Sequence, residues 1–306
     1  RIAEQAGHLA VDIAKRHCHP ADILTLASFE NALRVLLAVG GSTNAIIHLT
    51  AMAGRLGIKL SLDRLDELSK QTPVIVDLKP SGTGYMEDLH AAGGSVRILS
   101  ALSGSLDMQA MTVTGQTLGQ ELSNIDIPNW PQDIIRPSKQ PIYKEGGLAV
   151  LYGNLAPQGA IIKQAAASQH LLSYTGRAVV FENMADLAAR IDSPDLDVSQ
   201  DDILVLRQIG PKGAPGMPEA GLIPIPKKLA KQGVKDMVRI SDGRMSGTAA
   251  GTIILHVAPE SAVGGPLSLV RTGDQIQLDV AARQLNLLVS EQELERRRAK
   301  QPVSSS

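Results

Sequence analysis

The sequence predicts a protein of the α/β class, with a mainly helical first part and a β-rich, barrel-like second part. Two observations predict this arrangement. Apolar residues recur at helical spacing through most of residues 1–138, whereas residues 139–306 carry short apolar runs separated by glycine-rich turns. Between them, residues 122–142 contain four prolines and almost no periodicity, so we place the domain link there and the boundary after residue 138.

The first part predicts several helices and one buried strand. Residues 2–13 form an amphipathic pattern with one apolar face. Ser28 is expected to cap the following helix, which the pair Gly40-Gly41 ends. Residues 73–76 are a short apolar run typical of a buried strand. Further helices are expected over 44–56, over 63–70 and from Tyr85 onward.

The second part predicts short strands around a barrel-like core. The runs are 148–151, 178–181, 203–206, 237–240, 253–257, 267–270, 276–280 and 285–289. Glycine-rich turns separate these runs and helices are few, which favours a β-rich domain of the barrel type. A charged helix is expected over 291–300, and residues 302–306 are expected to fray.

The composition excludes several function classes. The 306 residues carry 30 Lys and Arg against 31 Asp and Glu, so no basic field favours nucleic acid. Aromatic residues make up 2% of the chain, which leaves few rings for stacking on bases. The apolar runs are far shorter than the roughly 20 residues that span a membrane. The only cysteine, Cys18, excludes an internal disulfide and fits a reducing compartment, which we take as the cytoplasm.

Two glycine-rich loops contain candidate binding residues. Residues 40–44 join two helices, where Asn44 or a hydroxyl could cap the next helix, or free N–H groups could hold a carboxylate. Plain capping is the simpler interpretation. Residues 210–219 contain three glycines and three prolines, so they fix an irregular loop that ends in Glu219. Such a loop could aim one oxygen ligand at a divalent cation, or it could be a structural turn with Glu219 in solvent.

A third loop, residues 241–248, follows a predicted strand and contains Ser246. A serine there could act as a nucleophile or a base if its surroundings lowered its pKa. The residues around Ser246 do not form a Gly-x-Ser-x-Gly elbow, which disfavours a hydrolase triad. The downstream His256 and Glu260 are expected to be structural.

Three further groups leave their roles open or favour structure. His90 near Asp88 could be a catalytic pair, although a lone helical histidine is more often structural. Lys163 could be a cation for the substrate or a surface residue. Cys18 lies between two histidines, but adjacent residues on a helix point in different directions, which disfavours a metal site.

Five stretches, in order along the chain, resemble one known family. They are SFENALRVLLAVGGSTNAIIHL, LKPSGTGYMEDLHAAGG, EGGLAVLYGNLAPQGAIIK, GPKGAPGMPEAG and RISDGRMSGTAAGTIILHVAPESAVGGPL. They resemble the C-terminal part of the dihydroxy-acid and sugar-acid dehydratases. PIYKEGGLAVLYGNLAP, together with GMPEAGLIPIPKKL and RMSGTA, resembles the pentonate (arabinonate and xylonate) branch more than the branched-chain amino-acid enzyme.

The resemblance implies a fold and a chemistry. Residues 1–138 would be the C-terminal portion of an α/β domain, and residues 139–306 a β-barrel-like C-terminal domain. The reaction would be dehydration of a 2,3-dihydroxy acid, such as L-arabinonate or D-xylonate, to a 2-keto-3-deoxy acid. The family uses Mg²⁺ and an iron–sulfur cluster, expected to be 2Fe-2S, held by three cysteines. Ser246 matches the base that takes the C2 proton, Thr248 a hydroxyl that contacts the substrate, and Glu219 a magnesium ligand.

The three cluster cysteines and the other magnesium ligands of the family lie upstream of the first residue here, and Cys18 matches none of them. We therefore expect a C-terminal fragment, inactive by itself, of a cytoplasmic homo-oligomeric enzyme. Its partner would be a small sugar acid or dihydroxy acid, with no nucleic acid and no membrane. Two alternatives stay open: the dihydroxy-acid dehydratase of branched-chain amino-acid biosynthesis, and a non-catalytic binding or assembly subunit.

Overall fold

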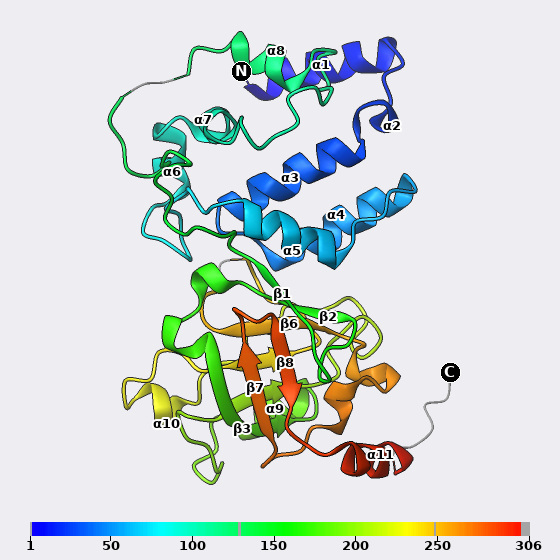
Figure 1. Cartoon of the computed structure of the whole chain (residues 1–306), viewed down its shortest axis with the longest axis vertical. Coiled ribbons are helices and arrows are strands. Elements are labelled where there is room, and N and C mark those ends of the chain that lie inside the picture. Colours follow the sequence, from blue (N-terminus) through cyan, green and yellow to red (C-terminus); the bar gives the residue numbers. More distant parts are fainter. Residues whose placement is uncertain (1, 128–129, 248, 301–306) are drawn as a thin grey trace. The chain divides into compact units, whose positions relative to one another are not determined.

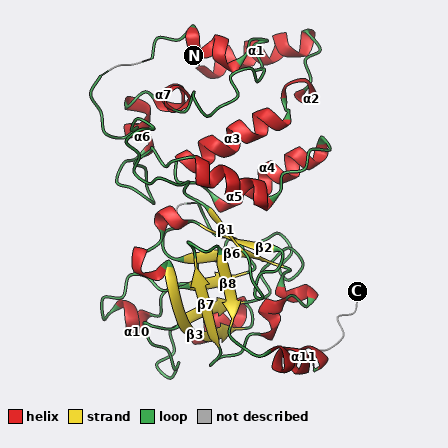
Figure 2. Cartoon of the chain, viewed as in Figure 1, coloured by secondary structure: helices red, strands yellow, loops and turns green. Residues whose placement is uncertain are grey.

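The computed structural model describes residues 2–127, 130–247 and 249–300. Its contacts divide the chain into two compact units, shown in Figures 1 and 2. The first comprises Arg1–Val39 and Ala45–Gly146, and the second comprises Gly40–Asn44 and Gly147–Ser306. The short segment Gly40–Asn44 therefore packs with the second unit, far along the chain. The domain boundary after residue 138 stays a prediction.

The first unit is helical where it is described, and isolated bridges take the place of strands there. Its core packs Ile75 and Val76 of an extended segment against Ile98, Leu102 and Ile135. The helices are α1 (Ile2–Lys15), α2 (Pro20–Ile23), α3 (Leu26–Ala38), α4 (Thr43–Arg55), α5 (Leu62–Gln71), α6 (Met86–Ala91), α7 (Gly94–Ala101) and α8 (Leu118–Ser123). Each predicted helix is therefore present.

Two local predictions in this unit are wrong. Ser28 does not cap α3, because the helix begins at Leu26 and Thr25 is its N-cap. Thr25 accepts a hydrogen bond from the Ser28 amide at 3.3 Å while the Ser28 hydroxyl accepts from the Thr25 amide at 2.8 Å, so the two side chains cap reciprocally. Val74, Ile75 and Val76 are buried as predicted, but residues 73–76 form isolated bridges rather than a strand.

The second unit contains an eight-stranded sheet in the order β1-β2-β6-β5-β4-β3-β7-β8. The strands are β1 (Ala149–Leu151), β2 (Gly159–Ile162), β3 (Ser173–Phe181), β4 (Ile203–Leu206), β5 (Arg239–Ser241), β6 (Ile253–Ala258), β7 (Gln275–Asp279) and β8 (Gln284–Leu287). Strands β3, β4, β5 and β6 run parallel, and the outer pairs are antiparallel. A bridge between Tyr152 and Gln284 joins the two edges, so the sheet nearly closes into the predicted barrel.

Strand alternation explains the layers of this unit. Ala178 and Val180 of β3 point into the barrel core, whereas Val179 and Phe181 face outward. The outer layer is covered by α9 (Met184–Arg190) and α10 (Lys227–Ala230), which contribute Leu187 and Leu229. The two faces of the parallel strands are therefore both buried, as continuous apolar runs predict.

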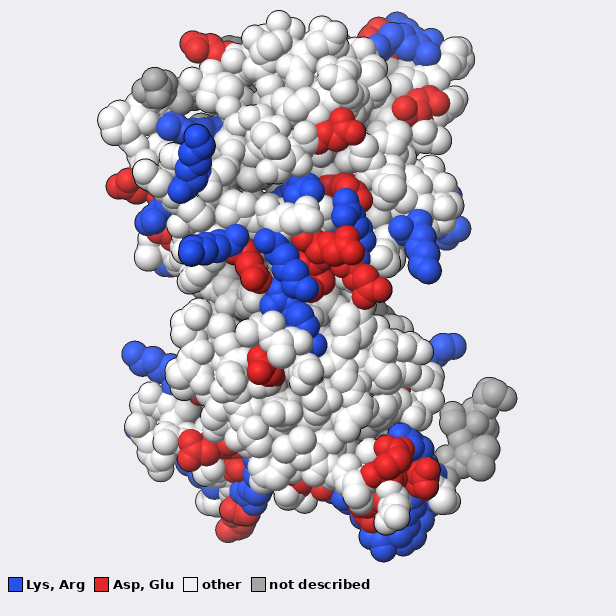
Figure 3. Space-filling view, viewed as in Figure 1, with Lys and Arg blue, Asp and Glu red and all other residues white. Residues whose placement is uncertain are grey.

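The charged tail forms α11 (Glu291–Ala299), as predicted, and Figure 3 shows acidic and basic side chains mixed over it. Residues 302–306 lie outside the described residues. The predicted strand at 267–270 is wrong, because a 3-10 helix, η4 (Pro266–Leu269), occupies it. Strand β2 was not predicted. In the described part of the chain, every helix is too short or too polar to cross a bilayer.

Candidate active site in the β-rich unit

Three loops of the second unit meet around Glu219. The Asn44 side-chain amide donates hydrogen bonds to Glu219 Oε1 at 3.3 Å and to the Met245 carbonyl at 2.9 Å. Arg244 Nη1 lies 3.8 Å from Glu219 Oε1. The glycine-rich loops that the sequence singled out separately are therefore neighbours. We call residues 40–44, 210–221 and 241–247 the three-loop site.

Backbone hydrogen bonds fix the loop that carries Glu219. The carboxylate of Glu260 accepts from the amides of Lys212 and Gly213, at 3.0 Å each. At the other end of the loop, the Gly221 amide donates to the Arg244 carbonyl at 2.6 Å. The structural role predicted for Glu260 is confirmed, because this carboxylate ties the loop to the rest of the unit.

Glycines let these loops approach one another closely. A Cβ added at Gly221 would lie 2.8 Å from the Arg244 carbonyl oxygen and 2.4 Å from a Leu255 methyl carbon. A Cβ at Gly243 would lie 2.5 Å from the Ile209 side chain. Distances this short force a shift, so glycine is required at both positions by packing.

A buried carboxylate supports the loop that carries Ser246. Asp242 is 2% exposed, and it accepts from the Ile209 amide at 3.1 Å and from the Ser261 amide at 2.8 Å. Met245 is also buried and packs with Ile253 of β6. Ser246 itself is half-buried, on the edge of this anchored segment. Thr248, the predicted substrate contact, lies outside the described residues.

Asn44 does not cap α4, so that half of the capping interpretation is wrong, while a cap by a neighbouring hydroxyl stays a prediction. Helix α4 begins at Thr43, and the Asn44 side chain reaches across to the other two loops instead. Its Oδ1 atom is buried and has no hydrogen-bond partner among the described residues. A buried carbonyl oxygen without a partner is unfavourable, and it is a ligand type that hard cations prefer.

Lys163 is not a surface residue. It follows β2 and is 4% exposed, and burial lowers the pKa of its amine to about 8. It lies at the end of β2, where η1 (Gln164–Ala166) begins. The surface interpretation is therefore wrong, and the role as a cation for the substrate stays a prediction.

His256 lies beside the same loops and was expected to be structural. Its amide donates to the Gly243 carbonyl at 3.1 Å, and its buried Nε2 atom has no hydrogen-bond partner within the described residues. Burial, and next the positive charge of Arg244, lower the pKa of the imidazole to about 4. The imidazole is therefore neutral at pH 7. The sequence pattern did not indicate that His256 is buried here, because its neighbours in the structure come from another loop.

The other sequence candidates lie in the first unit. Asp88 accepts a hydrogen bond from the Tyr85 amide at 2.7 Å, so it serves the start of α6. Cys18 is a half-buried free thiol. Among the residues that the structure describes, no group of three or more His, Cys, Asp or Glu is arranged to hold a metal ion.

Two family models match the chain. Residues 1–121 match the N-terminal region of the dihydroxy-acid/6-phosphogluconate dehydratases, and residues 133–305 match their C-terminal region. The chain belongs to this dehydratase family. The three-loop site lies mostly within the C-terminal match.

Similar proteins agree with this family. The chain is 49% identical over 300 residues to an L-arabinonate dehydratase of Rhizobium leguminosarum, covering 97% of this chain and 52% of that protein. It is 49% identical to a 6-deoxy-6-sulfo-D-gluconate dehydratase of Pseudomonas putida, covering 98% and 52%. It is 44% identical to a dihydroxy-acid dehydratase of Methanothrix thermoacetophila, covering 98% and 54%. The chain thus spans about half the length of the curated relatives it matches, and its resemblance to the pentonate branch is confirmed.

Proposed function

We propose that this chain is part of a sugar-acid dehydratase, a hydro-lyase that converts an aldonate to a 2-keto-3-deoxy acid. The observation that carries the proposal is the three-loop site, where Asn44, Glu219 and the Ser246 segment come together. The 49% identity to an L-arabinonate dehydratase supports an aldonate as the substrate. Because the chain spans about half of such relatives, the activity is proposed for the whole enzyme, and the chain alone is proposed to be inactive.

In this proposal Ser246 is the base that takes the proton from C2 of the substrate. A serine hydroxyl is a weak base in water, so positive charge nearby must stabilise its deprotonated form. Arg244, which lies 3.8 Å from Glu219, is the cation proposed for this role, and Lys163 is proposed as a cation for the substrate. Thr248 is proposed to hold a substrate hydroxyl.

Glu219 and the Asn44 amide oxygen are proposed as oxygen ligands for Mg²⁺. They fit this role in part: Asn44 Oδ1 is buried without a partner, and the Glu219 side chain is 44% exposed, so it is open to a ligand. When bound, the ion would stabilise negative charge developing on the substrate carboxylate and the C2 oxygen. Among the described residues Glu219 belongs to no group of three or more His, Cys, Asp or Glu that could hold an ion, so further ligands are required.

An iron–sulfur cluster does not fit the residues of this chain. Such clusters are held by several thiolates, and Cys18 is the only cysteine. We therefore propose a cluster, expected to be 2Fe-2S, only for the whole enzyme. The roles proposed for the residues of this chain do not depend on it. We also propose that the enzyme is cytoplasmic, which the cysteine-poor composition supports, and that it is a homo-oligomer, as the family resemblance implies.

The experiment is a substrate panel on the whole enzyme reconstituted with iron, sulfide and Mg²⁺. L-Arabinonate, D-xylonate, 6-deoxy-6-sulfo-D-gluconate and 2,3-dihydroxyisovalerate are supplied separately, and keto-acid formation is measured. We expect turnover of a sugar acid. Turnover of 2,3-dihydroxyisovalerate alone would instead favour the branched-chain enzyme. If no acid were converted by loaded enzyme, a non-catalytic binding subunit would be favoured.

A further inference from the structure

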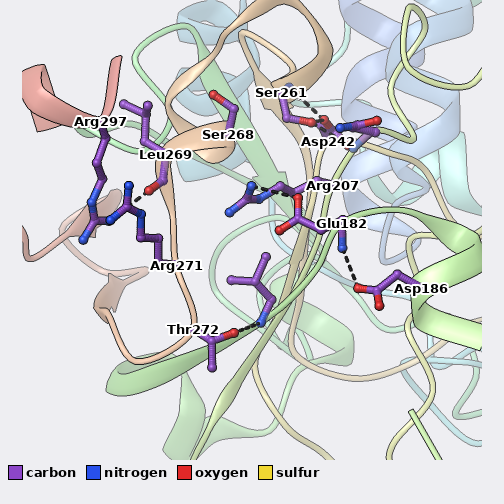
Figure 4. A network of polar contacts seen from close by, with 12 residues as sticks. Glu182, Asp186, Arg207, Asp242, Ser261, Ser268, Leu269, Arg271, Thr272 and Arg297 are labelled. Carbon is purple, nitrogen blue, oxygen red and sulfur yellow. Dashed lines mark hydrogen bonds and ion pairs between the residues drawn. The ribbon is translucent and has the colours of Figure 1, made fainter. Parts of the chain in front are cut away.

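A cavity of about 490 Å³ lies in the β-rich unit and shares no residue with the three-loop site. It lies where β3 and β4 end, next to the segment after η4 and the last turn of α11. Five cationic side chains and one carboxylate line it: Arg190, Arg207, Arg271, Arg297, Lys300 and Glu182. Figure 4 shows most of this network. We call it the Arg207 cavity.

Arg207 is the most buried of the cations without a full set of partners. The residue is 9% exposed, and its guanidinium makes one hydrogen bond, from Nη1 to Glu182 Oε2 at 3.1 Å. Its Nε atom is buried and has no partner within the described residues. A guanidinium has five N–H donors, so most of them lack an acceptor here. Leaving a buried, charged donor unsatisfied is unfavourable unless a ligand supplies the acceptor.

The remaining cations divide into two groups. Arg190 and Arg297 are paired with carboxylates, the first with Asp186 at 2.8 Å and the second with Asp274 at 2.5 Å and Glu293 at 2.8 Å. These two arginines are therefore neutralised by their own partners, and they contribute the walls of the cavity rather than free donors.

Arg271 and Lys300 carry positive charge that the described carboxylates do not fully neutralise. Arg271 is 54% exposed in its side chain and lies 3.7 Å from Glu293, which already pairs with Arg297. The Lys300 side chain makes no hydrogen bond or ion pair to the described residues. Figure 4 shows the guanidinium of Arg207 extending toward the side where Arg271 lies. Three cationic side chains that face one cavity can thus bind a single anion together.

Neutral groups complete the lining. The Thr272 hydroxyl oxygen accepts from the Val180 amide at 3.0 Å, which leaves its proton able to donate to a ligand. Val180, Leu269 and Val270 add apolar surface. The volume falls within the range of small-molecule sites, so a ligand larger than a bare ion would fit.

We propose that the Arg207 cavity binds the phosphoryl group of a small phosphorylated molecule, or inorganic phosphate, through Arg207, Arg271 and Lys300. Arginine favours phosphate because its planar N–H pairs match two oxygens at once. One carboxylate among six charged lining groups leaves the cavity suited to an anion and unsuited to a metal ion. The proposal does not depend on the dehydratase reaction, since it concerns a different part of the unit.

The test is calorimetric titration of the whole enzyme with inorganic phosphate, with ribose 5-phosphate and with unphosphorylated ribose, in chloride buffer. We expect saturable binding of at least one phosphate compound and none of ribose. Tighter binding of ribose 5-phosphate would assign the site to a phosphorylated metabolite, and equal or tighter binding of phosphate to the free ion. Failure of both to bind at about 10 mM would overturn the proposal.

Variants connect binding to the cavity. Arg207→Gln is expected to weaken phosphate binding about 10-fold or more, and Arg271→Gln, an exposed position that is safe for folding, about 3-fold or more. Arg298→Gln is the matched control, because it removes a charge from α11 at a residue that pairs with Glu291 and does not line the cavity. Phosphate should also raise Tm in the parent and control but less in the cavity variants. Equal affinity in all four proteins would place the ion elsewhere and contradict the proposal.

Discussion

The three-loop site and the Arg207 cavity belong to one β-rich unit but are built in different ways. Backbone groups hold the first, since Glu260 ties down the loop of Glu219 and Gly221 joins that loop to Arg244. Long cationic side chains from separate segments line the second. A site built from glycines and backbone amides places an oxygen ligand with little freedom. A site built from arginines supplies charge that can adjust to its ligand.

This difference also decides how far each site can be recognised from the sequence. Glycines and prolines cluster where loops must bend and touch, so the segments of Glu219 and Ser246 stand out. Arg207 looks like any charged residue that follows a strand. Its neighbours Arg271 and Lys300 are brought to it by the fold alone.

The largest expected effect concerns Glu219, the proposed Mg²⁺ ligand in the three-loop site. Glu219→Gln keeps the size of the side chain and removes its charge, so we expect at least about a 100-fold loss of dehydratase rate, with a higher Mg²⁺ requirement. The measurement is rate against Mg²⁺ concentration for the whole enzyme. Glu295→Gln, on the exposed face of α11, is the control. An unchanged Mg²⁺ dependence in Glu219→Gln would remove this residue from the proposed metal site.

Lys163 sharpens the comparison, because it is a buried cation of the same β-rich unit. Its pKa in the folded protein, about 8, lies below the ordinary 10.5, so the unfolded chain binds more protons between these values. Stability should therefore rise as pH increases from 8 to 10.5, by about 3 kcal/mol from this residue. Denaturant unfolding across that range measures the slope.

Lys163→Met should flatten that slope, because the methionine has no proton to lose. A parent protein whose stability stayed level from pH 8 to 10.5 would show that the amine keeps its ordinary pKa. The substrate role is tested separately, as Lys163→Met should raise KM for a sugar acid if the amine holds the carboxylate.

The backbone construction of the three-loop site predicts a smaller, steric effect. Gly221→Ala would place a methyl group against the Arg244 carbonyl, so we expect a destabilisation of about 1–3 kcal/mol, with loss of activity. Thermal and denaturant unfolding measure it. Gly54→Ala is the matched control, because it lies in α4 with open space around it, and it should stabilise by up to about 1 kcal/mol. Equal behaviour of the two variants would argue against tight loop packing.

Much of the fold could be predicted from periodicity, and the exceptions have physical reasons. The run at 267–270 contains three buried apolar residues, Leu267, Leu269 and Val270, and so short a run fits a 3-10 turn as well as a strand. Strand β2 begins at a glycine and ends before a lysine, so its apolar pattern is short. The near-closure through Tyr152 and Gln284 joins residues far apart in the chain, which no local pattern reveals.

The candidate site was predictable in its parts but not in its assembly. Glu219 and Ser246 could be singled out from loop composition and resemblance. Asn44 or a neighbouring hydroxyl was expected to cap α4, because capping is the commonest use of a polar residue at a helix start. Only the fold shows that this side chain instead crosses to Glu219 and leaves Oδ1 without a partner.

The measurement that tests the proposed function most directly is turnover of L-arabinonate by the whole enzyme and its Ser246→Ala variant, with loss of the C2 proton followed by deuterium labelling. Removing the base should slow keto-acid formation by about 1,000-fold while folding and metal content stay unchanged. Ser105→Ala, at an exposed turn in the first unit, should match the parent. A Ser246→Ala enzyme that still released the C2 proton at the parent rate would contradict the assignment of this serine as the base.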